Sequence, residues 1–170
     1  MWYGFNVLWL FSAGWKELDN LDKKVIGALE DGKKDVDFIA DMGCNFVRLL
    51  LLDECIKQIV SRGLHCSLNV HRAPGYCING NELERDNLWT DQIAQDAFTS
   101  LWTLFAKRYA GYSKEQLSFD LLNEPPAPGE YGLTHENHKL IMARVAAAIR
   151  NVTLDRPIIC DGLCGGHIAC

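Results

Sequence analysis

The sequence of 170 residues has no apolar run close to the roughly 18 residues that a membrane-spanning helix needs. It also has no run of Lys or Arg residues, and 22 acidic against 17 basic residues leave a formal net charge of −5. Without a basic stripe, a protein has little with which to follow a phosphate backbone. The sequence therefore predicts neither a membrane nor a nucleic acid as a partner, and its 48% of apolar residues suffice for a folded core.

The seven cysteines are odd in number and scattered, so they do not form the pattern of a small disulfide-stabilised domain. Most are typical of small buried apolar side chains. Four residues near the end of the chain have a spacing that suits zinc: Cys160, Cys164, His167 and Cys170. A zinc-dependent hydrolase is therefore one alternative, which metal analysis of the purified protein would test.

Short apolar segments alternate with longer amphipathic segments along the chain. Strands are predicted at 5–11, 45–49, 64–70, 117–122 and 157–160, helices at 32–42, 53–62, 91–109 and 135–151, and a long loop at 71–89. The third helix is recognised by apolar residues at helical spacing, namely Ile93, Ala97, Leu101, Leu104 and Phe105. This alternation indicates a parallel sheet covered by helices, either an open doubly wound sheet or a (β/α) barrel.

Polar residues lie at the C-terminal ends of three of the predicted strands. They are Arg48, His71, Arg72, Asn123 and Glu124. Barrel enzymes gather their active sites from several strand ends on one face. An open sheet instead binds at one switch point, usually with a glycine-rich turn after its first strand, and this sequence has no G-x-G-x-x-G motif. The α/β fold class is therefore expected to be a (β/α)8 TIM barrel.

The junction between the second strand and the second helix is too short for such a fold. Connections of this kind normally take about 2–6 residues with turn chemistry, whereas residues 49–53 are four leucines and an aspartate. We therefore expect residues to be missing near 49–53. Peptide mapping across residues 48–57 would test this hypothesis.

Glu124 is the strongest candidate for chemistry. It follows a buried strand and lies between Asn123 and Pro125, where a carboxyl group is poorly solvated and its pKa is expected to be raised. A carboxylic acid that stays protonated near neutral pH can act as a general acid. The alternative is a capping glutamate in a turn, and Asn123 is either a donor to a substrate hydroxyl or a turn residue.

The other candidates also have structural alternatives. Arg48 leaves an apolar strand, where it either holds a catalytic carboxylate in its ionised form or pairs with Asp120. His71 and Arg72 head the loop after the third strand. Aromatic rings stack on the apolar faces of sugars, so the candidates for sugar contacts are Trp9, Trp15, Tyr76 and Trp89, each of which would also suit a core.

Five motifs lie at the predicted strands: Gly4-Phe5-Asn6, Asn45-Phe46-Val47-Arg48-Leu49, Leu68-Asn69-Val70-His71-Arg72-Ala73-Pro74-Gly75, Phe119-Asp120-Leu121-Leu122-Asn123-Glu124-Pro125, and Asp161-Gly162 after the fifth strand. With these motifs the sequence resembles glycoside hydrolase family 5, the cellulase-type (β/α)8 barrels, over residues 4–162. The resemblance implies retaining hydrolysis of β-glycosidic bonds in a polysaccharide or oligosaccharide. The first expectation is an endo-β-1,4-glucanase acting on cellulose or another β-glucan.

The resemblance also implies roles for individual residues. Glu124 matches the general acid/base, Asn123 the contact to the sugar 2-hydroxyl, Arg48 the arginine near the nucleophile, and His71 the histidine that lines the site. A retaining mechanism needs a second carboxylate as nucleophile. In this family it is a glutamate after the seventh strand, and no residue of this chain matches that position.

The length predicts an incomplete barrel, because a complete one takes about 250 residues. Residues 1–170 are expected to form a partial barrel domain with about five βα units and a C-terminal truncation. The alternative function is a non-catalytic carbohydrate-binding fragment, and a truncated barrel would form homo-oligomers that cover its open strand edges. The resemblance implies no cofactor. It implies secretion, although no signal peptide is visible at the N-terminus.

Overall fold

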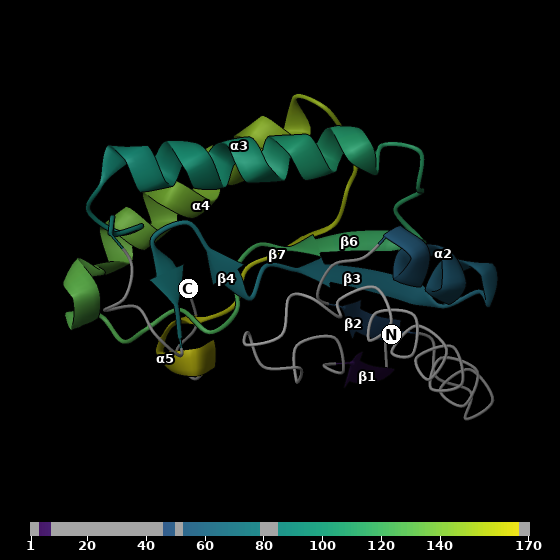
Figure 1. Cartoon of the computed structure of the whole chain (residues 1–170), viewed down its shortest axis with the longest axis horizontal. Coiled ribbons are helices and arrows are strands. Elements are labelled where there is room, and N and C mark those ends of the chain that lie inside the picture. The colour runs from purple at the N-terminus through teal and green to yellow at the C-terminus, as the bar shows by residue number, and fades with distance from the viewer. Residues whose placement is uncertain (1–3, 8–45, 50–52, 79–84, 167–170) are drawn as a thin grey trace, which may run out of the picture. The chain divides into compact units, whose positions relative to one another are not determined.

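The structure is a computed structural model that describes residues 4–7, 46–49, 53–78 and 85–166 (Figure 1). The chain divides into two compact units. Unit 1 comprises residues 1–68 and 115–117, and unit 2 comprises residues 69–114 and 118–170. The predicted helix at 32–42, the end of the first predicted strand and the junction at 50–52 lie outside the described residues.

Unit 1 contains the first three strands of a parallel sheet. β1 (Gly4–Val7) pairs with β2 (Phe46–Leu49), with Phe5 opposite Val47. β2 pairs in turn with β3 (His65–Asn69), which follows α2 (Asp53–Ser61). The predicted apolar face of α2 is confirmed, because Cys55, Ile56 and Ile59 are all buried. Gly63 ends this helix region with a φ of 73°, a left-handed conformation that glycine adopts without strain.

Unit 2 contains the next strands and the two long helices. β6 (Leu117–Asp120) pairs in parallel with β7 (Ile158–Ile159), and Phe119 lies opposite Ile158. α3 (Gln92–Arg108) precedes β6, and α4 (His135–Arg150) lies between β6 and β7 in the chain and against α3 in space (Figure 1). The order of the sheet is β1-β2-β3-β6-β7. The alternation of parallel strands and helices predicted from the sequence is therefore confirmed.

The predicted loop at 71–89 contains a small hairpin. β4 (Arg72–Ala73) pairs in antiparallel fashion with β5 (Tyr76–Cys77) across a turn at Gly75. Gly75 has a φ of 77°, and a Cβ atom there would lie 2.6 Å from the backbone nitrogen of Leu88. Only glycine therefore fits this turn. Turns of this size are set by backbone conformation, which the apolar pattern of a sequence does not encode.

The buried face of α3 is displaced by one residue from the predicted apolar row. Its buried residues are Ala94, Phe98, Trp102, Phe105 and Ala106. Ile93 and Leu104 of the predicted row are 70% and 58% exposed. The face with the larger aromatic side chains is the one that is buried, because these rings remove more apolar surface from water. Trp102 packs 5.1 Å from the ring of Phe119 and donates its indole N–H to the carbonyl oxygen of Leu121 at 3.1 Å.

α4 begins at a capping box. The Thr134 hydroxyl accepts from the backbone N–H of Asn137 at 3.1 Å, and the Asn137 side chain accepts from the backbone N–H of Thr134 at 2.8 Å. This satisfies two donors that the first turn of the helix would otherwise leave unpaired. The Asn137 amide also donates to the carbonyl oxygens of Gly132 and Trp89, at 2.9 and 3.1 Å. The start of α4 is thereby tied to the segment that precedes α3.

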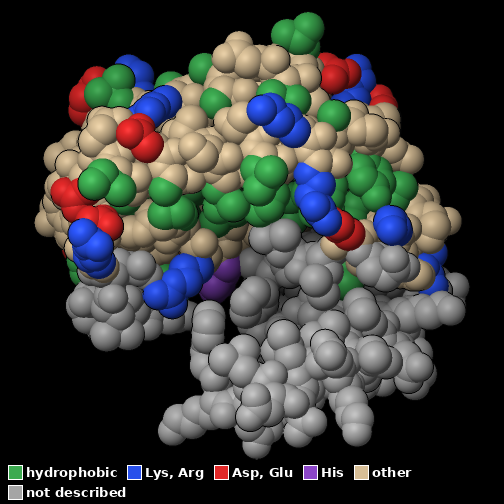
Figure 2. Space-filling model, turned by 45° about the horizontal axis from the view of Figure 1, so that its top comes forward, with side chains coloured by type: hydrophobic (Ala, Val, Ile, Leu, Met, Phe, Trp, Pro, Cys, Tyr) green, Lys and Arg blue, Asp and Glu red, His purple; other side chains and the backbone are tan. Residues whose placement is uncertain are grey.

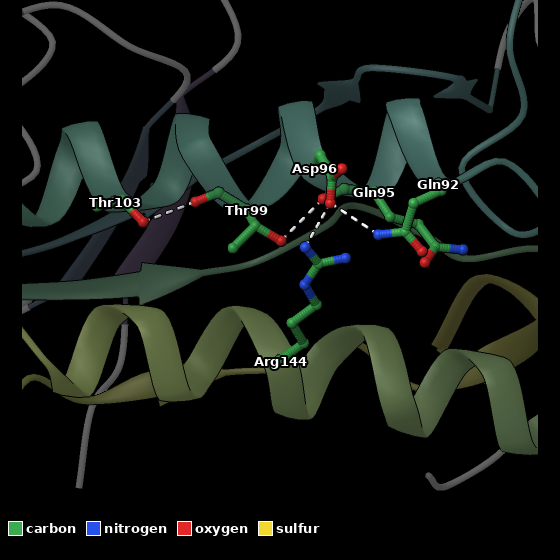
Figure 3. A network of polar contacts seen from close by, with 6 residues as sticks. All are labelled: Gln92, Gln95, Asp96, Thr99, Thr103 and Arg144. Atoms are coloured by element: carbon green, nitrogen blue, oxygen red, sulfur yellow. Dashed lines mark hydrogen bonds and ion pairs between the residues drawn. The ribbon is translucent and has the colours of Figure 1, made fainter.

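A polar network lies on the outer side of the α3–α4 contact (Figure 3). Asp96 accepts hydrogen bonds from Gln92 and from Arg144 of α4. The hydroxyls of Thr99 and Thr103 donate to carbonyl oxygens one turn earlier, both at 2.8 Å. An open groove of about 490 Å³ runs beside these residues. Figure 2 shows that apolar and charged side chains are interspersed on the surface that this view presents, and within the described residues no helix is long and apolar enough to span a membrane.

Candidate active site

Glu124 lies four residues beyond the end of β6, in a backbone conformation unusual for a residue with a side chain. Its φ is 47°, which is left-handed. The backbone N–H of Glu124 donates to Oδ2 of Asp161 at 3.2 Å, and its carbonyl oxygen accepts from the Tyr76 hydroxyl at 2.6 Å. Both peptide groups that flank this side chain are therefore held by side chains from other parts of unit 2.

The side chain of Glu124 is exposed, whereas Asn123 and Pro125 on either side of it are buried. The prediction of a poorly solvated carboxyl group is wrong for this structure. It assumed that the burial of the preceding strand and of its neighbours extends to the Glu124 side chain. β6 instead ends at Asp120, and the left-handed backbone of Glu124 leaves its side chain exposed between buried neighbours. An exposed carboxylate at a strand end is accessible to a substrate.

Asn123 is a buried polar residue beside Glu124. Its side chain is 3% exposed, and its backbone N–H donates to the carbonyl oxygen of Val70 at 3.0 Å. Among the described residues, no acceptor lies within hydrogen-bond reach of its Nδ2 atom. Because buried donors are nearly always satisfied, this amide group is available to an oxygen from outside the described part of the chain.

The end of β3 lies next to Asn123. Val70 donates its backbone N–H to the carbonyl oxygen of Asp120 at 3.2 Å and accepts from the N–H of Asn123. His71 follows Val70 directly and is half-buried, and Arg72 after it is exposed. The structure therefore brings the strand ends at 70–72 and 123–124 together within unit 2, as barrel sites require.

Tyr76 and Trp89 are buried within unit 2, with exposed fractions of 0% and 2%. Their rings meet edge to face with centroids 5.3 Å apart, and Trp89 lies 6.0 Å from the ring of His138. This packing leaves neither ring a free face for stacking on a sugar. Burial raises the pKa of the Tyr76 hydroxyl, so this group stays protonated and remains a hydrogen-bond donor to Glu124.

Three sequence candidates cannot be placed against these residues. Arg48 belongs to β2, where its backbone pairs with Asn6 and Ser67 in unit 1. Trp9 and Trp15 lie outside the described residues. The roles predicted for these three residues stay predictions.

The segment after β7 contributes contacts that the sequence did not reveal. Asp161 holds the N–H of Glu124, and the backbone N–H groups of Cys164 and Gly165 donate to the carbonyl oxygens of Pro126 and Pro125, at 3.2 and 3.1 Å. Cys164 and Gly165 belong to the short turn α5 (Leu163–Gly166) and have φ values of 56° and 64°. A carboxylate just after a predicted strand was the one available signal for Asp161.

The zinc alternative gains no support from the described residues. Cys160 is exposed and Cys164 is half-buried. His167 and Cys170 lie outside the described residues, and the part that is described holds no group of three or more His, Cys, Asp or Glu side chains suited to a metal ion.

The fold and site define a class of protein, an α/β protein with a parallel sheet and polar residues at its strand ends. Comparison with known proteins agrees with this class. The family model described as Cellulase (glycosyl hydrolase family 5) matches residues 21–165. The chain therefore belongs to glycosyl hydrolase family 5. It is 27% identical over 151 residues to Endoglucanase C of Acetivibrio thermocellus and to Endoglucanase C307 of a Clostridium species, with 76% of this chain aligned in each case.

Solved structures show the same fold. A crystal structure of a glycoside hydrolase superposes with a TM-score of 0.85 at 43% identity, covering 99% of this chain and 55% of that one. The endoglucanase Cel5A of Thermotoga maritima gives a TM-score of 0.62 at 23% identity, covering 79% of this chain and 45% of that one. The chain spans 42% of the length of Endoglucanase C, and so covers about half of its relatives.

Proposed function

We propose that the protein takes part in retaining hydrolysis of β-1,4-glycosidic bonds in a glucan, with Glu124 as general acid/base. The observation that carries this proposal is the pairing of an exposed carboxyl group on Glu124 with a buried, available amide group on Asn123. Membership of glycosyl hydrolase family 5 and similarity to proteins named endoglucanase support it.

In the proposed reaction, Glu124 protonates the leaving oxygen and then removes a proton from the water that releases the sugar. Asn123 donates to a sugar hydroxyl, and His71 and Arg72 line the same strand ends. The nucleophile is a second carboxylate about 5 Å from Glu124, and the role of Arg48 near that nucleophile stays a prediction from the sequence. Tyr76 and Trp89 are buried and support the site rather than contact the sugar, since the Tyr76 hydroxyl donates to the carbonyl oxygen of Glu124 and its ring packs on Trp89.

The substrate class is taken from the relatives named endoglucanase. Structures of Cel5A from Thermotoga maritima have been solved with cellobiose and with mannotriose. A barrel of this fold therefore holds sugars of either kind, so the fold does not choose between glucan and mannan. Both polysaccharides belong in the test.

The variant Glu124→Gln of the full-length protein tests the function. It keeps the shape of the side chain but removes the acid, and general acid/base catalysis is worth about 10²–10⁴-fold in rate. We expect release of reducing sugar from β-glucan to fall by at least about 100-fold. Glu136→Gln is the matched control, because Glu136 is exposed in the first turn of α4 and should keep the full rate.

Two results would contradict the proposal. Glu124→Gln with the wild-type rate on both β-glucan and mannan would remove Glu124 from the chemistry. A wild-type protein that binds oligosaccharide in calorimetry but never hydrolyses it would instead be a carbohydrate-binding protein.

A further inference from the structure

We infer that Tyr76 and Asp161 are positioning residues that hold the backbone of Glu124 in its left-handed conformation and so aim its carboxyl group. This inference rests on the proposed role of Glu124 as general acid/base. Neither residue is proposed to touch the substrate. Their effect passes through the two peptide groups on either side of Glu124.

The conformation of Glu124 needs support from its surroundings. With a φ of 47°, its Cβ atom is crowded by the backbone, and residues other than glycine persist there only where neighbouring contacts hold them. The two contacts are opposite in kind. Asp161 accepts the N–H on one side, and Tyr76 donates to the carbonyl oxygen on the other.

Tyr76 is itself rigidly held. Its side chain is fully buried, and its ring packs edge to face on Trp89. Trp89 is fixed through its backbone, since its N–H donates to Oδ1 of Asn87 at 2.8 Å and its carbonyl oxygen accepts from Asn137. The Tyr76 hydroxyl is therefore a hydrogen-bond donor at a fixed position, and it restrains the carbonyl oxygen of Glu124.

The contacts continue along the chain beyond Glu124. The carbonyl oxygens of Pro125 and Pro126 accept from the turn at residues 164–165, and the N–H of Asn123 donates to Val70. Four consecutive residues are thus fixed by β5 and by the segments that follow β3 and β7. Such support matters for proton transfer, because displacing a catalytic group by about 1 Å can cost roughly 100-fold in rate.

The first test compares two substrates in the full-length protein. Hydrolysis of cellotetraose needs an acid for its poor leaving group, whereas 2,4-dinitrophenyl β-cellobioside has a leaving group that departs without one. For Tyr76→Phe and Asp161→Ala we expect kcat/KM on cellotetraose to fall by about 10–100-fold, with a fall of less than about 3-fold on the activated substrate, where no acid is needed. Asp161→Asn keeps an acceptor oxygen and should restore most of the rate.

Matched controls separate positioning from a general loss of structure. Tyr131→Phe and Asp155→Ala alter exposed residues of unit 2 and should leave kcat/KM on both substrates unchanged. Equal losses on the two substrates in Tyr76→Phe and Asp161→Ala would overturn the inference, because they would show a merely structural role. Wild-type rates in both variants would overturn it as well.

A second measurement is independent of activity. Amide hydrogen exchange followed by NMR should show the N–H of Glu124 exchanging at least about 10-fold faster in Asp161→Ala than in the wild type, with Asp161→Asn close to the wild type. Unchanged exchange at Glu124 would overturn the inference. An inactive wild-type protein in which Asp161→Ala still accelerates this exchange would overturn the proposed function and leave the anchoring of Glu124 confirmed.

Discussion

At the scale of single residues, the site depends on backbone conformation as much as on side-chain chemistry. Glu124 and Asn123 are adjacent, yet one is exposed and the other is buried with an available amide. The left-handed φ of Glu124 separates their environments. A site of this kind stores strain at Glu124, the proposed catalytic residue, and balances it with the hydrogen bonds around it.

Replacing Glu124 by glycine and by alanine measures that strain. At a left-handed position, glycine avoids the clash of the Cβ atom, so Glu124→Gly should be about 1 kcal/mol more stable to urea than Glu124→Ala. At Glu136, in the first turn of α4, the order should reverse by about 0.5–1 kcal/mol, because glycine destabilises a helix. Alanine being the more stable residue at both positions would contradict the left-handed conformation.

At the scale of the elements, helix ends and buried faces are decided by packing partners. Arg156 is buried, and its guanidinium donates to the carbonyl oxygens of Tyr109, Tyr112 and Ser113 after α3. It also lies over the ring of Phe119, 5.3 Å from its centroid. A cation at this end of a helix satisfies carbonyl groups that have no partner within the helix. The Arg156 side chain thereby links the end of α3 to Phe119 of β6.

The displaced face of α3 predicts which substitutions are costly. Trp102→Ala removes a buried ring that packs on Phe119, so it should lower the free energy of unfolding by about 3–5 kcal/mol. Ile93→Ala, in an exposed position, should change it by less than about 0.5 kcal/mol. Urea denaturation of both variants is the measurement. A comparable loss for Ile93→Ala would instead favour the face built on Ile93, Ala97 and Leu104.

At the scale of the whole molecule, the candidate residues are distributed over two units. Glu124, Asn123, His71 and Arg72 belong to unit 2, and Arg48 belongs to unit 1. Barrel sites are in general built from the ends of several strands. The proposed acid/base, Glu124, and the two residues that hold its backbone, Tyr76 and Asp161, all belong to unit 2. The effects of Tyr76 and Asp161 on Glu124 can therefore be compared within one unit.

Global unfolding should depend on pH through His138. Burial, with a smaller contribution from His135, lowers the pKa of His138 below its usual value. Below about pH 6.5 the unfolded chain then binds more protons than the folded one, so stability falls as the pH drops, with a slope of at most about 1.4 kcal/mol per pH unit for one proton.

Comparing variants isolates this contribution from other titrating groups. His138→Phe should flatten the dependence of the urea midpoint on pH between 7 and the lowered pKa, whereas His135→Gln, at an exposed position, should largely keep it. If His138→Phe showed the same dependence as the wild type, the titration of His138 would have no part in acid unfolding.

The sequence by itself determined the parallel order of strands and helices and the candidates at the strand ends. Apolar periodicity and strand-end polar residues are local patterns, and the buried face of α2 and the existence of α3 and α4 followed from them. Only the tertiary structure decided which row of α3 is buried, that Glu124 is exposed, and that Tyr76 and Trp89 lie inside. These features depend on competition between packing partners far apart in the chain, such as Trp102 with Phe119 and Tyr76 with Glu124. The apolar pattern of a short segment does not indicate which of these partners will pack together.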